Sequence, residues 1–159
     1  MGVEIFGNLR TNKRLEACLE QVRQGFISGS QPVLAHEGTS GAYVLKGPGD
    51  DSSALGVFKP IDEEPFAPNN PRGMQAPFGS ETCRPGVKSG ESTIREVTAY
   101  LLDHCSFAGV PLTTYVEVSH PSLPNKPVHE SEVTSEEYLN LISGLLPLKG
   151  SIAGTKASN

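Results

Sequence analysis

The chain has 159 residues, of which 36% are hydrophobic and 19% charged, with 17 glycines and 13 prolines. This length suits one domain, and the glycine and proline content favours a loop-rich globular fold over a helical bundle. The net charge of −5, the three cysteines without CxxC spacing and the lack of a long apolar run disfavour a nucleic-acid module, a disulfide framework and a transmembrane segment. We expect a cytoplasmic chain, able to lie at a membrane surface.

An amphipathic helix is predicted between Thr11 and Phe26, where apolar residues recur at steps of three and four. Thr11 or Asn12 is the candidate N-cap, and Gly29 follows the end of the pattern. The charged side chains fall on the opposite face, so we interpret this segment as a packing helix without a chemical role.

Three short β-prone runs come next, at residues 32–35, 42–46 and 54–59, and clusters of turn-forming residues separate them. This pattern predicts a meander of antiparallel strands, which Pro60 ends. The following segment, residues 65–90, is too rich in proline and glycine for a long helix or a central strand. We interpret residues 66–90 of it as an insertion and expect it to be the most mobile internal segment.

Helical periodicity returns in residues 91–104, and residues 111–119 alternate as a strand does. A further short helix is predicted at residues 134–146, followed by a short strand or a frayed tail at 150–159. The sequence therefore predicts an α+β fold. Four or five antiparallel strands would pack against the helix at 91–104, and the amino-terminal helix would flank them.

Two features of the predicted sheet could bind an anion. The turn at Thr39–Gly41 joins two strands, and such a turn lets backbone N–H groups approach phosphate oxygens, although an ordinary hairpin turn would look the same. Lys59 shares a strand face with Leu55 and Val57, so its ammonium group needs an anionic partner if that face is buried. The competing interpretation is a lysine at the strand end that extends into water.

Glu96 is the candidate partner for Lys59, because it borders the apolar stripe of the helix at 91–104. A lysine on a strand that pairs with a glutamate on the next helix is the arrangement with which protein kinases hold ATP phosphates. Glu96 also lies three residues after Thr93, so it could instead complete a capping box. In that case Glu91 is the alternative partner.

A family resemblance becomes specific when these residues are combined with their neighbours. The segments that carry it are Thr39-Ser40-Gly41-Ala42-Tyr43, Val57-Phe58-Lys59-Pro60-Ile61-Asp62-Glu63-Glu64-Pro65, Asn69-Asn70-Pro71-Arg72-Gly73, Gly90-Glu91-Ser92-Thr93-Ile94-Arg95-Glu96-Val97, Ala99-Tyr100-Leu101-Leu102-Asp103-His104 and Phe107-Ala108-Gly109-Val110-Pro111. Over about residues 20–120 the chain resembles the amino-terminal lobe of the type II phosphatidylinositol 4-kinases, and within them the plant branch with ubiquitin-like domains. The long, charged FKPxxEEP run at 58–65 is the most specific element.

The resemblance implies a protein-kinase-like small lobe that binds ATP and transfers its γ-phosphate to phosphatidylinositol, or to serine or threonine of a protein. Thr39, Ser40, Gly41, Ala42 and Tyr43 would form the loop that covers the phosphates. A second set would contact the nucleotide, with Lys59 at the phosphates, Glu96 as its partner on the helix, and Val57 and Val116 as walls of the adenine pocket.

The resemblance leaves the chain incomplete as a kinase. By this resemblance, residues 11–120 correspond to the small lobe, and residues 121–159 are a divergent or truncated end. No catalytic-loop aspartate and no metal-binding aspartate is recognised, so we assign no catalytic residue and no metal ligand, and we expect the Mg²⁺ ligands in another lobe. The alternative is a non-catalytic, pseudokinase-like interaction module. The sequence does not choose between a lipid and a protein acceptor.

Overall fold

The computed structural model describes residues 2–5, 12–49, 53–124, 128 and 149–154. Its helices are α1 (Lys13–Ile27) and α2 (Ser92–Leu102), with short 3-10 helices η1 (Ile61–Glu63) and η2 (His104–Ser106). Its strands are β1 (Gly2–Ile5), β2 (Val33–Leu34), β3 (Tyr43–Lys46), β4 (Ala54–Pro60), β5 (Thr113–Ser119) and β6 (Lys149–Gly154). The predicted helix at 134–146 lies outside the described residues.

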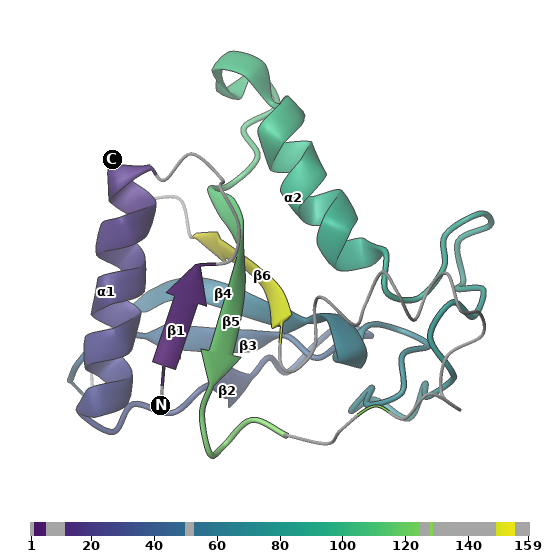
Figure 1. Cartoon of the computed structure of the whole chain (residues 1–159), viewed down its shortest axis with the longest axis horizontal. Coiled ribbons are helices and arrows are strands. Elements are labelled where there is room, and N and C mark those ends of the chain that lie inside the picture. The colour runs from purple at the N-terminus through teal and green to yellow at the C-terminus, as the bar shows by residue number, and fades with distance from the viewer. Residues whose placement is uncertain (1, 6–11, 50–52, 125–127, 129–148, 155–159) are drawn as a thin grey trace.

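The strands form one sheet in the order β1-β5-β6-β4-β3-β2, and every neighbouring pair is antiparallel (Figure 1). The meander β2-β3-β4 and the strand after α2 are as the sequence predicts. The sheet has six strands instead of the expected four or five, because β1 adds to its edge beside β5. β6 inserts between β4 and β5, which confirms a strand near the carboxyl end of the chain. The α+β class and the small-lobe arrangement are therefore confirmed.

Helix α1 covers one face of the sheet. Its N-cap is Asn12, whose side chain accepts a hydrogen bond from the Arg14 backbone N–H at 2.9 Å. The apolar stripe of α1 packs into a core with strand residues; the core members are Leu15, Leu19, Val22, Phe26, Tyr43, Leu45, Phe58, Val116, Val118 and Leu123. Burial of each large side chain of this kind contributes about 1.5–3 kcal/mol. This core fixes the position of β3 and β4.

Helix α2 lies on the other face of the sheet, where it contacts β5 and β6. In β4 the buried Phe58 faces the α1 core, so the next residue, Lys59, points to the α2 side. Lys59 and Val57 are half-buried. Val57 and Lys59 thus lie on the half-open face toward α2, whereas Leu55, which the sequence analysis placed on the same face, packs against the α1 core next to a register shift between β3 and β4.

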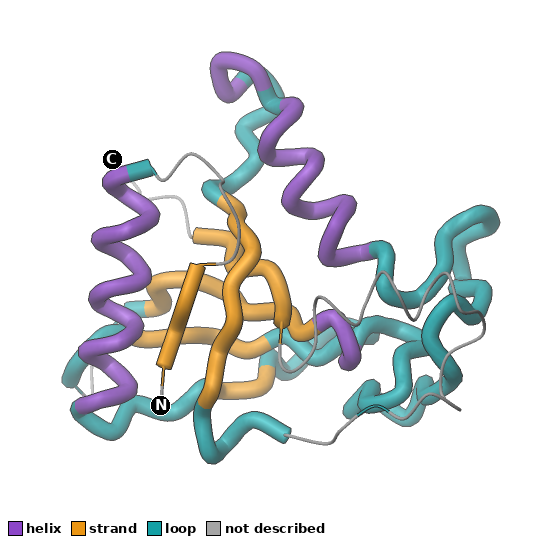
Figure 2. The backbone as a smooth tube through the Cα atoms, viewed as in Figure 1, coloured by secondary structure: helices purple, strands orange, loops and turns teal. Residues whose placement is uncertain are grey.

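The segment 65–90 is a long irregular loop beside the start of α2 (Figure 2). One isolated bridge, between Glu81 and Lys88, joins two parts of it, and Phe78 is completely buried. The absence of regular helix and strand agrees with the sequence analysis, whereas the mobility of the segment stays a prediction.

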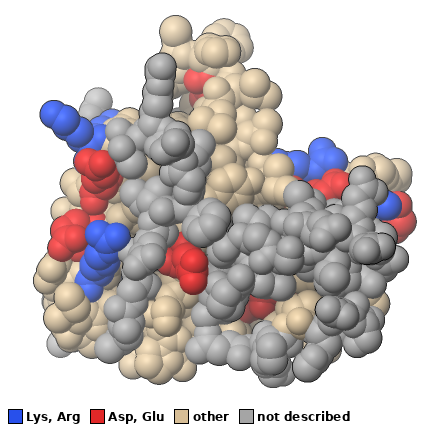
Figure 3. All heavy atoms as spheres, viewed as in Figure 1, with Lys and Arg blue, Asp and Glu red and all other residues tan. Residues whose placement is uncertain are grey.

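The surface over α1 in Figure 3 mixes acidic and basic side chains. Glu20 and Arg23 of this helix form an exposed ion pair at 3.4 Å. In the part of the chain that the structure describes, no helix combines the length and the apolar composition needed to cross a membrane.

Candidate functional site

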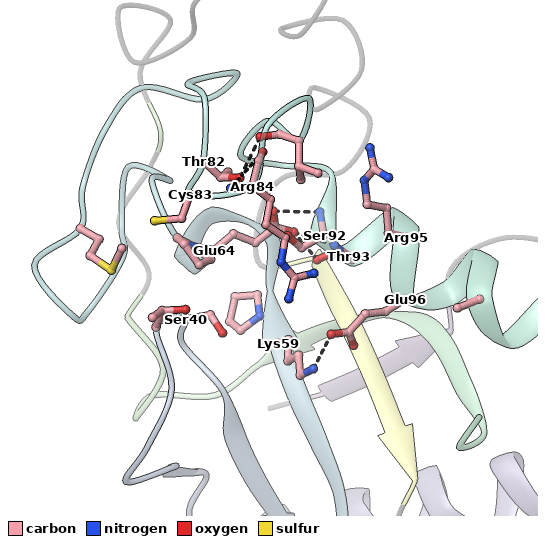
Figure 4. Close-up of a pocket in the computed structure, with 16 residues that line it drawn as sticks. Ser40, Lys59, Glu64, Thr82, Cys83, Arg84, Ser92, Thr93, Arg95 and Glu96 are labelled. Carbon is pink, nitrogen blue, oxygen red and sulfur yellow. Dashed lines mark hydrogen bonds and ion pairs between the residues drawn. The ribbon is translucent and has the colours of Figure 1, made fainter. Parts of the chain in front are cut away.

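A cavity of about 500 Å³ opens between the 39–41 turn, the end of β4, the first half of α2 and the segment 65–90 (Figure 4). Its polar lining includes Thr39, Ser40, Lys59, Glu96 and Arg84. Elements far apart in the sequence thus meet at one place, and two of them are the turn and the lysine that the sequence analysis singled out.

Lys59 and Glu96 form an ion pair across the gap between β4 and α2. Their side chains are 35% and 34% exposed, so the pair lies at the mouth of the cavity and not in the core. The predicted pairing is therefore confirmed. Glu91, the alternative partner, instead accepts a hydrogen bond from Arg95 at 2.8 Å.

The start of α2 shows why the capping-box interpretation of Glu96 is wrong. Helix α2 begins at Ser92, and the Thr93 hydroxyl donates to Glu64 at 2.8 Å. Glu64 also accepts hydrogen bonds from the backbone N–H groups of Gly90, Ser92 and Thr93, at 2.8, 3.0 and 2.7 Å. Glu64, which directly follows η1 and lies 28 residues before Ser92, thus caps the helix and leaves Glu96 available to Lys59.

Hydrogen bonds to Glu63 hold the turn that leads into β3. The Gly41 backbone N–H donates to the Glu63 carbonyl at 2.9 Å, and the Tyr43 hydroxyl donates to Glu63 Oε2 at 2.8 Å. A Cβ atom on Gly41 would lie 1.9 Å from Oε2 and 2.7 Å from the Glu63 Cβ. Only glycine therefore fits at position 41 with this carboxyl group in place.

Burial governs the charge of these carboxyl groups. It raises the pKa of Glu63 to about 7, and the neighbouring Asp62 acts in the same direction, while the hydrogen bond from Tyr43 opposes both. Burial also raises the pKa of Asp62 and that of Glu64, although the α2 N–H groups oppose this at Glu64. The FKPxxEEP run therefore contains three carboxyl groups with raised pKa values, of which Glu63 contacts the turn and Glu64 the start of α2.

Asn70 connects the turn to this run. Its side-chain amide lies within hydrogen-bond distance of the carbonyl groups of Thr39, Glu63 and Glu64, at 2.8, 3.1 and 3.0 Å. Its Oδ1 accepts from the Arg72 and Met74 backbone N–H groups at 2.9 and 3.2 Å. The sequence analysis assigned no role to Asn70, and the only signal for it was its place in the Asn-Asn-Pro-Arg-Gly segment.

The nine predicted site residues do not all meet at the cavity. Thr39, Ser40, Lys59 and Glu96 line it. The others do not: Gly41 is buried on Glu63, Ala42 and Val57 are half-buried, and Tyr43 and Val116 belong to the α1 core. Val116 is completely buried there and has no access to the cavity. Its neighbour Tyr115 points to the α2 side, where burial, and to a smaller extent the charge of Glu64, raise the pKa of Tyr115 to about 12.

Comparison with known proteins supports one family. The family model described as phosphatidylinositol 3- and 4-kinase matches residues 39–146. Phosphatidylinositol 4-kinase gamma 4 of Arabidopsis thaliana is 44% identical over 115 residues, which are 65% of this chain and 20% of that protein. Phosphatidylinositol 4-kinase gamma 1 of the same plant is 38% identical over 135 residues, which are 84% of this chain and 22% of that protein.

A rice relative, phosphatidylinositol 4-kinase gamma 4 of Oryza sativa subsp. japonica, is 37% identical over 124 residues, covering 72% of this chain and 22% of that protein. No solved structure gives a significant match. The chain thus spans about a fifth of the length of these curated relatives. The family match covers the turn, the Lys59–Glu96 pair and the FKPxxEEP run, and the chain belongs to the phosphatidylinositol 3- and 4-kinase family.

Proposed function

We propose that this chain is the nucleotide-binding part of an ATP-dependent kinase that transfers the γ-phosphate of ATP to phosphatidylinositol. The observation that carries the proposal is the Lys59–Glu96 ion pair, which lies in one cavity with Thr39 and Ser40 of the glycine turn. A lysine held by a helix glutamate beside such a turn is the arrangement that positions the phosphates of ATP in kinases.

In this proposal, Lys59 contacts the phosphates and Glu96 holds its side chain at the cavity. Thr39 and Ser40 cover the phosphates with their backbone N–H groups and hydroxyls, while the Gly41 N–H is bonded to the Glu63 carbonyl and lets the turn lie close to Glu63. Val57 faces the α2 side of the sheet and is the candidate wall for the adenine. The burial of Val116 in the α1 core does not support the same role for that residue.

ATP enters kinases with Mg²⁺, which neutralises charge at the transferred phosphate. The described part of the chain has no group of three or more His, Cys, Asp or Glu side chains placed to hold a metal ion. We therefore derive no metal ligand from these residues and propose that the carboxylates for Mg²⁺ come from elsewhere in the full-length gene product.

The lipid acceptor is inferred from the names of the relatives, which are phosphatidylinositol 4-kinases. A lipid acceptor places the enzyme at the cytoplasmic surface of a membrane while it acts. A protein acceptor is the competing possibility, and transfer to protein but not to lipid vesicles would favour it.

Replacement of Lys59 by alanine in the full-length gene product tests the proposed function. We expect loss of phosphate transfer to phosphatidylinositol vesicles with little change in stability, since a half-exposed ion pair contributes at most about 1 kcal/mol. Lys46→Ala is the matched control, because Lys46 ends the neighbouring strand β3 and does not line the cavity. Full activity of the Lys59→Ala variant would refute the assigned role, and wild-type protein without any transfer would favour the pseudokinase-like module.

A further inference from the structure

The cavity has more positive charge than its own carboxylates can balance. Three cationic side chains line it, from Lys59, Arg84 and Arg95, against two carboxylates, from Glu64 and Glu96. Arg84 comes from the segment 65–90, of which the sequence analysis interpreted residues 66–90 as a mobile insertion.

Both carboxylates already have partners. Glu96 is paired with Lys59, and Glu64 accepts the hydrogen bonds at the start of α2. Arg95 is paired with Glu91 at 2.8 Å. The carboxylates of the cavity are therefore not available to a further cation.

Arg84 is the cation that remains. The Arg84 backbone makes hydrogen bonds with the Thr82 hydroxyl and the Val87 N–H, and the Arg84 guanidinium forms no ion pair within the described residues. Figure 4 shows the Arg84 side chain reaching into the cavity toward Lys59, whereas the Arg95 side chain points away. The exposed Arg84 guanidinium thus points toward a second cation, and no carboxylate of the described residues is paired with it.

We propose that Arg84 binds the triphosphate of ATP, from the side of the cavity opposite the glycine turn, and so completes with Lys59 a two-cation phosphate site. This inference rests on the proposed function and deepens it. A guanidinium presents five N–H donors in a planar fork that matches phosphate oxygens, so one residue can hold two oxygens at once. The hydroxyls of Thr39 and Ser40 add donors at the opposite wall.

In this proposal, the function of the irregular segment 65–90 is to hold Arg84 at the cavity. Both ends of the segment are tied to Glu64 of the FKPxxEEP run, because the Asn70 side-chain amide donates to the Glu64 carbonyl and the Gly90 backbone N–H donates to the Glu64 carboxylate. Arg84 lies between these two anchors. The segment thus carries a cation to the cavity on a backbone that is fixed at both ends.

Nucleotide binding by the full-length gene product tests the proposal. The dissociation constants of ATP, inorganic tripolyphosphate and adenosine are measured by calorimetry for the wild type, Arg84→Ala, Arg84→Lys and Lys59→Ala. The matched control is Lys88→Ala, which removes the same charge from the same segment but does not line the cavity. Thermal melting of each variant checks the fold.

Loss of a charge-assisted hydrogen bond should weaken ATP and tripolyphosphate binding by about tenfold in Arg84→Ala and leave adenosine binding unchanged. Arg84→Lys should recover part of the loss, and Lys88→Ala should stay within about twofold of the wild type. Unchanged ATP binding in Arg84→Ala, with weakened binding in Lys59→Ala, overturns the role of Arg84 and leaves the proposed function standing. Wild-type affinity in both variants, or a wild type that binds no ATP, overturns both proposals.

Discussion

Glu63 is a completely buried carboxyl group directly beneath Gly41 of the glycine turn. Its Oε2 accepts from Tyr43, while its Oε1 has no hydrogen-bond partner among the described residues. A charged carboxylate in this position is costly, because burial and the neighbouring Asp62 both favour the protonated form. Under the proposed function, the protonated acid would also avoid placing a negative charge next to the phosphates that the turn covers.

This burial predicts a pH-dependent stability. The pKa of Glu63 rises from 4.5 to about 7 on folding, so the folded state binds more protons than the unfolded state between these values. The contribution of Glu63 is fully present below pH 4.5 and is lost as the pH rises through about 7. The free energy of unfolding, measured with urea from pH 5 to pH 8, should therefore fall more steeply in the wild type than in Glu63→Gln. Glu37→Gln, at an exposed position, should follow the wild type, and equal slopes in Glu63→Gln and wild type would contradict the assignment.

The contact between Gly41 and Glu63 predicts a strong effect of one methyl group. A Cβ on Gly41 would overlap Glu63 Oε2 and Cβ, so Gly41→Ala should lower the free energy of unfolding by about 1–3 kcal/mol. Gly47→Ala is the control, because its Cβ would meet only the end of the Leu55 side chain, at 3.3 Å. In a double-mutant cycle, Gly41→Ala should lower the free energy of unfolding by less in the Glu63→Ala background than in the wild type. Additive effects would show that the two residues do not compete for this space.

Helix α2 depends on a residue outside itself for its first turn. Glu64 accepts from three backbone N–H groups and one hydroxyl there, whereas the N-cap residue Glu91 makes no side-chain capping bond. The helix dipole also favours a negative charge at this end. Because Glu64 follows β4 by only a few residues, the cap fixes α2 relative to the strand that carries Lys59.

Removal of this cap should affect both stability and geometry. The amide of Glu64→Gln can accept through its oxygen only, so buried N–H groups lose their partner and the free energy of unfolding should fall by about 1–3 kcal/mol, as denaturant titration would measure. We also expect weaker ATP binding, since α2 carries Glu96. Glu91→Gln changes the same charge at the same helix end, where the Glu91 side chain pairs with Arg95 and makes no capping bond, so the expected cost is below about 1 kcal/mol. Equal costs in the two variants would argue against Glu64 as the cap.

The elements divide clearly into what the sequence could predict and what it could not. Periodicity identified α1, α2 and β5, because each buries side chains at a regular spacing along the sequence. Short β-prone runs between turn clusters identified β2, β3 and β4. The Lys59–Glu96 pair followed from the same patterns together with the kinase arrangement. The cap by Glu64 could not be predicted, because its partners lie 26 to 29 residues away and only the fold brings them together. For the same reason Thr93 was a false capping-box signal, since its hydroxyl is used by Glu64.

At the scale of the molecule, the described residues provide one wall of the proposed nucleotide site. The sheet, α2 and the segment 65–90 supply cations and hydroxyls to the cavity, whereas the described residues offer no metal-binding cluster. The curated relatives are about five times longer than their matches to this chain, which cover 20% to 22% of them. Phosphoryl transfer needs the metal ions and a base as well as the phosphate-binding wall.

The isolated 159-residue chain should therefore transfer no phosphate to phosphatidylinositol or to protein, and it should bind ATP more weakly than the full-length gene product does. A single wall leaves the adenine and the Mg²⁺ in water, so part of the binding energy and the charge neutralisation at the γ-phosphate are lost. Transfer of radiolabelled phosphate from ATP, measured for both proteins on the same lipid vesicles, decides the matter. Turnover by the isolated chain above background would mean that it contains a catalytic group, for which the carboxyl groups of Asp62, Glu63 and Glu64 would be the first candidates for substitution.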